Sequence, residues 1–155
     1  RLSSVRHRLE VKEQAIQHAE EVAADVARSR EIIEAIVARF REVGLVDDEA
    51  YAHMLVRSQQ QGRGLARRGL AHELRKKGVD EQTAGVALDA EVTAEGERAR
   101  AEELVAKKLR TMSGLDRQVK TRRLAGMLAR KGYSGELAYS VIREALDQDP
   151  EHRRD

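Results

Sequence analysis

The sequence contains no cysteine and no tryptophan, and its 155 residues include only one proline and one phenylalanine. The absence of cysteine excludes disulfide frameworks, thiolate metal sites and cysteine nucleophiles. No apolar stretch approaches the roughly 20 residues that a membrane-spanning helix needs. No short apolar run near the start resembles a signal peptide. We therefore expect a cytoplasmic protein that does not contact a membrane.

No group of side chains in the sequence indicates catalysis or metal binding. The five histidines never stand at the i, i+4 spacing of a helical metal pair. The adjacent carboxylates Asp47 and Asp48 precede an expected helix, where capping is the ordinary role of such residues. The GxG in residues 61–69 lacks the Lys-Ser/Thr of a phosphate-binding loop, which favours a helix–helix turn. We expect no catalytic residue, no metal and no cofactor, and hence a protein that is not an enzyme.

Glycines divide a sequence that consists mostly of helix-forming residues. Ala, Glu, Arg, Leu and Val dominate it, which predicts an all-α fold. Ser29 is an expected cap for a helix whose apolar residues recur at spacings of three and four until Gly44. Three more helices are expected in the middle of the chain: from Asp47 or Asp48 to Gly62, from Leu65 to Lys77, and after the capping residue Asp80.

One pattern in the middle of the chain recurs 54 residues later, where Gly132 corresponds to Gly78. Seven of the seventeen residues in 68–84 are identical to their counterparts in 122–138. These are Arg68, Leu70, Ala71, Leu74, Lys77, Gly78 and Ala84, which correspond to Arg122, Leu124, Ala125, Leu128, Lys131, Gly132 and Ala138. On a helical wheel Leu70 and Leu74 face the core, whereas Arg68 and Arg75 point outward.

We interpret this recurrence as two copies of a three-helix module, at residues 47–92 and 95–148. Residues 1–46 would be a divergent first helical repeat, and a start at Arg1 in place of Met is compatible with truncation. Because residues 1–43 contain no glycine, this segment is either a diverged repeat or a longer helix. A single small module buries little apolar surface, so neighbours must pack together. We expect an all-α fold of tandem three-helix repeats in an elongated, curved array.

The net charge of +2 conceals separate basic and acidic zones. Bases collect in residues 55–79 and 105–133, whereas acids collect in 20–34 and 89–103. Outward charge is usually only solvated surface, but an excess in both copies favours an anionic partner. Four aromatic residues are too few for base stacking, so contact with DNA would be weak and indifferent to base sequence. The candidate contact residues are Arg57, Arg63, Arg67, Arg68, Arg75, Lys76, Lys107, Lys108, Arg122, Arg123 and Arg130.

Two segments resemble one known family, the RecX regulatory proteins. Residues 40–88 resemble the middle of that family, with Gly-Leu-Val-Asp-Asp-Glu, then Tyr-Ala, a Gly-Arg-Gly turn and Glu-Leu…Lys-Gly before a capped helix. Residues 122–142, RRLAGMLARKGYSGELAYSVI, resemble its last repeat. The order and spacing of the two motifs match the family, whereas residues 1–39 depart from its pattern.

This resemblance implies tandem three-helix repeats and a regulator that lies in the groove of the RecA–DNA filament. Such a protein suppresses the ATPase and strand exchange of RecA, and thereby modulates recombination, DNA repair and the SOS response. It has no cofactor, is expected to be a monomer, and binds single- and double-stranded DNA weakly. The candidate bases would contact RecA or DNA, and the sequence does not distinguish the two. The alternative is a sequence-independent DNA-binding protein, for which basic faces suffice.

Overall fold

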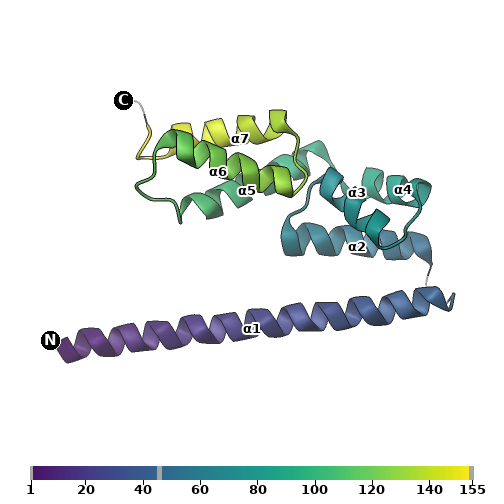
Figure 1. Cartoon of the computed structure of the whole chain (residues 1–155), viewed down its shortest axis with the longest axis horizontal. Coiled ribbons are helices and arrows are strands. Elements are labelled where there is room, and N and C mark those ends of the chain that lie inside the picture. Colours follow the sequence, from purple (N-terminus) through teal and green to yellow (C-terminus); the bar gives the residue numbers. More distant parts are fainter. Residues whose placement is uncertain (1, 45–46, 154–155) are drawn as a thin grey trace. The chain divides into compact units, whose positions relative to one another are not determined.

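The computed structural model describes residues 2–44 and 47–153, which form seven α-helices and no strand (Figure 1). The expected all-α class is confirmed. The chain divides into two units, residues 1–47 and residues 48–155. The helices are α1 (Leu2–Glu42), α2 (Asp48–Arg63), α3 (Arg67–Lys76), α4 (Glu81–Glu91), α5 (Ala94–Leu109), α6 (Arg117–Arg130) and α7 (Gly135–Gln148).

The first unit contains one uninterrupted helix, α1, which matches the longer helix that the sequence allowed as the alternative to a diverged repeat. The expected cap Ser29 lies inside α1, because no glycine or proline before residue 44 stops the helix. Gly44 does end it as predicted, with a φ of 77° that glycine adopts without steric cost. No described residue of α1 is buried. Neither α1 nor another helix in the described part of the chain is long and apolar enough to cross a bilayer.

Helices α2, α3 and α4 form the first module of the second unit. Leu70 and Leu74 of α3 are 1% and 0% exposed, which confirms the side of the helix predicted to face the core. Helix α3 is followed by Gly78, whose N–H donates to the Arg75 carbonyl at 3.0 Å. Asp80 caps α4, because its Oδ1 accepts from the Thr83 N–H at 2.8 Å. Gly78 and Asp80 therefore have the roles that the sequence predicts for them.

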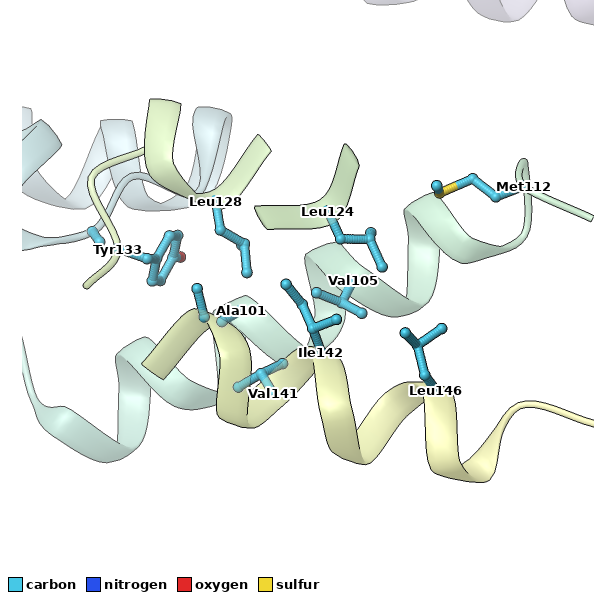
Figure 2. Packing of buried hydrophobic residues seen from close by; sticks show 11 residues of the cluster. Ala101, Val105, Met112, Leu124, Leu128, Tyr133, Val141, Ile142 and Leu146 are labelled. Atoms are coloured by element: carbon cyan, nitrogen blue, oxygen red, sulfur yellow. The ribbon is translucent and has the colours of Figure 1, made fainter. Parts of the chain in front are cut away.

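Helices α5, α6 and α7 form the second module around a core that all three contribute to (Figure 2). Leu124 and Leu128 of α6, the counterparts of Leu70 and Leu74, are both 0% exposed. In Figure 2 they lie opposite Val105 of α5 and Ile142 of α7. Figure 1 shows the two modules next to each other within the second unit, and the all-helical tandem repeats match the expected fold class.

The two modules touch backbone to backbone at two glycines. A Cβ atom on Gly69 would lie 2.5 Å from the Lys131 carbonyl oxygen. A Cβ atom on Gly132 would lie 2.2 Å from the Gly69 nitrogen. The Ala66 N–H donates to the same Lys131 carbonyl at 2.9 Å, and the Ala66 side chain joins the core of the second module. The modules therefore pack together closely, as the small size of each core requires.

Candidate functional site

All eleven candidate bases are exposed. Arg57 nevertheless forms hydrogen bonds within its own module. Its Nη2 lies 2.8 Å and its Nε 3.0 Å from Glu91 Oε1, so it joins α2 to α4. His53 Nδ1 contacts the same oxygen at 3.0 Å. The hydrogen bond from Arg57, followed by that from His53, lowers the pKa of Glu91 to about 2. An external anion would compete with an existing carboxylate for Arg57.

Three other candidates also face carboxylates of the first module. Arg63 Nη1 donates to Glu73 Oε1 at 3.1 Å, and Lys76 Nζ lies 4.0 Å from the same oxygen. Glu73 is only 8% exposed, so its charge is compensated by these cations. Arg67 Nη2 donates to Asp89 Oδ1 at 2.6 Å. These bases contribute to the module as well as to its surface charge.

Seven candidates form no ion pair with any described residue, and they are the freest to meet a partner. Two of them, Arg68 and Arg122, stand at equivalent positions of the two modules and are both exposed. The full set is Arg68, Arg75, Lys107, Lys108, Arg122, Arg123 and Arg130. The structure therefore separates the candidates into four that have internal partners and seven that do not.

Arg122 borders a broad, shallow hollow of about 710 Å³ on α6 and α7. Tyr139 also lines this hollow and is 53% exposed. Arg117 completes the charged part of the wall, although its Nη2 donates to Asp147 Oδ1 at 2.8 Å. Tyr139 is not among the residues predicted from the sequence to form a contact site. The available signal was its position on α7, outside the apolar stripe formed by Ala138, Val141 and Ile142.

A second hollow, of about 300 Å³, lies where the two modules meet. It brings the candidates Arg63 and Lys107 together with two bases that were not candidates, Arg100 and Lys131. Lys131 Nζ donates to the Arg63 carbonyl at 2.6 Å. The sequence offered a signal for Lys131, which matches Lys77 in the recurrence. It offered none for Arg100, which lies in an acidic zone of the sequence.

The Gly-Arg-Gly turn forms another wall of this second hollow. Gly64 has a φ of 65° and accepts a hydrogen bond on its carbonyl from the Tyr133 hydroxyl at 2.7 Å. Tyr133 is 4% exposed, and its ring is part of the core of the second module. Burial is the main reason why the pKa of Tyr133 is raised, and the charge of Arg100 acts in the opposite direction. The turn therefore joins the modules, in addition to linking two helices as predicted.

Helix α3 receives its N-terminal anion from the other module. Its N-cap residue, Ala66, has no side chain that can accept a hydrogen bond. Glu97 of α5 takes that role, because its Oε1 accepts from the Arg67 N–H at 2.6 Å. A carboxylate is favourable there, because the helix dipole is positive at the N-terminus. This is a further polar contact between the modules.

A buried lysine ties the segment after α7 to the second module. Lys120 is 1% exposed, and its Nζ lies 2.9 Å from both Asp149 Oδ2 and Glu151 Oε2. Burial acts to lower the pKa of Lys120, but the hydrogen bonds to Glu151 and Asp149 outweigh it, so the pKa is raised. Asp149, Glu151 and His152 are close enough to share a cation. The ammonium group of Lys120 already occupies the two carboxylates, which indicates a structural role.

Comparison with known proteins places both modules in one family. The model of the second three-helix domain of RecX matches residues 47–88, and the model of the third matches residues 95–142. The Regulatory protein RecX of Streptomyces coelicolor is 53% identical over 110 residues, which cover 71% of this chain and 58% of the relative. That of Thermobifida fusca is 50% identical over 108 residues, which cover 70% and 58%. The chain thus spans less than two thirds of the length of these relatives.

Two solved structures share the fold. The crystal structure of RecX from Lactobacillus salivarius aligns with a TM-score of 0.58 at 24% identity, covering 74% of this chain and 73% of that one. A crystal structure of regulatory protein RecX aligns with a TM-score of 0.58 at 27% identity, covering 74% and 56%. Because the two domain models together match more than half of its residues, this chain belongs to the RecX family of regulatory proteins.

Proposed function

We propose that this protein binds the RecA–DNA filament and inhibits the ATPase and strand exchange of RecA, thereby modulating recombination and DNA repair. The family to which it belongs supports a regulatory role. The observation that carries the proposal is the pair Arg68 and Arg122. These arginines recur at equivalent positions of successive modules, are exposed, and have no ion-pair partner among the described residues. A repeated cation suits a partner whose anionic groups also repeat.

The chemistry of the surface supports binding without base recognition. Arginine side chains meet phosphates and carboxylates through charge-assisted hydrogen bonds. Reading bases in single strands needs aromatic side chains for stacking. Tyr139 is the one tyrosine of the described chain that is exposed. Contacts of this kind hold a protein on a charged filament irrespective of the DNA sequence.

The decisive experiment is the RecA ATPase assay on single-stranded DNA with increasing amounts of this protein. Strong inhibition far below one copy per DNA-binding site is expected, because a protein acting on the filament affects many RecA subunits. Inhibition that appears only when the protein saturates the DNA would contradict the proposal.

That second outcome would favour the other candidate function, a sequence-independent DNA-binding protein. The seven unpaired bases favour this candidate, because they suffice to bind a phosphate backbone. Raising the DNA concentration separates the two functions. Extra single-stranded DNA relieves inhibition that arises from sequestration of DNA. Inhibition of assembled filaments persists as long as this protein occupies its binding sites on RecA.

A further inference from the structure

The hollow where the modules meet, called the junction pocket below, concentrates positive charge. Its walls come from segments far apart in the sequence, since Arg63 ends α2, Arg100 and Lys107 lie on α5, and Lys131 follows α6. Glu103 is the one carboxylate that lines the pocket among the described residues. Four cations therefore share a space of about 300 Å³ with one anion.

Arg100 makes this pocket unusual. Its Nε and Nη2 atoms are buried, and neither has a hydrogen-bond partner within residues 2–44 and 47–153. Folded proteins rarely leave buried donors unpaired, and a charged donor is the least favourable case. Because atoms buried to this degree are not open to the pocket, a ligand accepts from them only after the Arg100 side chain turns toward it. Arg100 therefore adds a positive charge and unpaired donors to the wall of the pocket.

The other cations of the pocket are only partly compensated. Arg63 already faces Glu73, but Lys107 and Lys131 form no ion pair with a described residue. Burial, followed by repulsion from Arg63 and Arg130, lowers the pKa of Lys131. Lys131 Nζ has one hydrogen bond, to the Arg63 carbonyl, although an ammonium group carries three donors. An anion would therefore meet both free charge and free donors.

We propose that the junction pocket binds a phosphate group, supplied by the DNA backbone. Phosphate suits the pocket better than a carboxylate does, because its tetrahedral oxygens accept from several directions at once. One guanidinium alone satisfies the two oxygens of a carboxylate side by side. The exposed Arg130, whose charge acts on Lys131 of the pocket, offers a contact to an adjacent phosphate. The assignment to DNA rests on the proposed function, whereas the assignment to phosphate rests on the pocket alone.

The first test is calorimetric titration of the full chain with inorganic phosphate, with acetate at equal ionic strength as the comparison. The wild type is expected to bind phosphate more tightly than acetate, and Arg100→Gln should weaken phosphate binding at least about tenfold. Lys107→Gln should weaken it as well, and since Lys107 is exposed this variant is expected to fold even if Arg100→Gln does not. Arg143→Gln removes an exposed charge that does not line the pocket and serves as the matched control.

The second test identifies the source of the phosphate. The affinity for a single-stranded oligonucleotide is measured against salt concentration for the same four proteins. Each lost phosphate contact reduces the salt slope by about 0.7, so Arg100→Gln and Lys107→Gln should show shallower slopes than Arg143→Gln. An unchanged slope in a variant that no longer binds inorganic phosphate would overturn the assignment to DNA and indicate free phosphate.

Two results would overturn the pocket itself. One is phosphate affinity that is absent in the wild type, or equal in the wild type, Arg100→Gln and Lys107→Gln. The other is acetate binding as tight as phosphate binding and equally dependent on Arg100, which would indicate an acidic protein segment as the ligand. The titration contains no RecA, so it stands even if the protein fails to inhibit RecA. Conversely, normal RecA inhibition without phosphate binding would contradict the proposal for the pocket and leave the proposed function standing.

Discussion

At the scale of single residues, Lys120 shows how a buried charge is stabilised. Its side chain is 1% exposed, and two carboxylates face its ammonium group. Asp149 and Glu151 keep partial exposure, at 14% and 39% of their side chains. The lysine therefore bears most of the cost of burial, and its two hydrogen bonds offset that cost.

Replacing Lys120 by Met keeps the length of the side chain and removes its charge. Loss of hydrogen bonds to charged groups is expected to lower the free energy of unfolding by about 1 to 3 kcal/mol. Urea denaturation followed by circular dichroism measures the change. Lys108→Met, at an exposed position, should stay within about 0.5 kcal/mol of the wild type. Equal stability of the two variants would show that the Lys120 ion pairs contribute nothing.

Glu91 makes stability depend on acid pH. Its pKa is lowered from the ordinary 4.5 to about 2, so its contribution is fully present above pH 4.5 and disappears as the pH falls to about 2. Glu91→Gln should therefore be less stable than the wild type at pH 6. The difference between the two proteins should shrink between about pH 4.5 and pH 2. Urea denaturation at pH 6, 4 and 3 tests this, and a difference that does not vary with pH would contradict it.

At the scale of secondary-structure elements, Gly78 and Gly132 end equivalent helices but have different surroundings. Both adopt positive φ, at 77° and 93°. A Cβ on Gly78 would meet no heavy atom within 4 Å, whereas a Cβ on Gly132 would clash with the backbone of Gly69. The turn at Gly132 therefore has a role beyond ending a helix, because it lets α6 approach the neighbouring module.

This difference predicts unequal effects of one substitution at the two sites. Gly78→Ala should cost about 1 kcal/mol, because only the left-handed backbone conformation is strained. Gly132→Ala should cost at least about 1 to 3 kcal/mol more, because the modules must also move apart. Thermal unfolding of both variants provides the measurement. If Gly132→Ala is no worse than Gly78→Ala, the close contact between the modules is not required for stability.

At the scale of the whole molecule, function depends on which charges remain available after folding. Arg57, Arg63 and Arg67 have carboxylate partners within the second unit. Arg68 and Arg122 have none among the described residues. Ion pairs within the protein therefore leave fewer bases available to a partner than composition alone would suggest.

The double variant Arg68→Gln and Arg122→Gln should inhibit RecA about tenfold less effectively. Each exposed ion pair contributes up to about 1 kcal/mol, and 1.4 kcal/mol corresponds to a factor of ten. The concentration that half-inhibits the RecA ATPase is the readout, and circular dichroism verifies the fold. Arg30→Gln, at an exposed position of α1, is the control for loss of charge. Full inhibition by the folded double variant would exclude these arginines from the interface.

Local patterns in the sequence determined the helices, several of their ends and the core of the two modules. Asp80 and Ser134 cap helices, and Leu70, Leu74, Leu124 and Leu128 are buried, because capping and helical periodicity act over only a few residues. The recurrence and the family motifs likewise depend on order along the chain. The function and the contact residues inferred from them stay predictions.

Only the tertiary structure decided what residues distant in sequence do together. Ser29 looked like a helix start, but nothing before Gly44 interrupts α1, and a cap residue cannot break a helix that its neighbours favour. Packing buries the Nε and Nη2 atoms of Arg100 and places the Lys120 ammonium group against Asp149. Burial and pairing of this kind arise from contacts across about 30 residues or more, for which the local sequence carries no periodic signal.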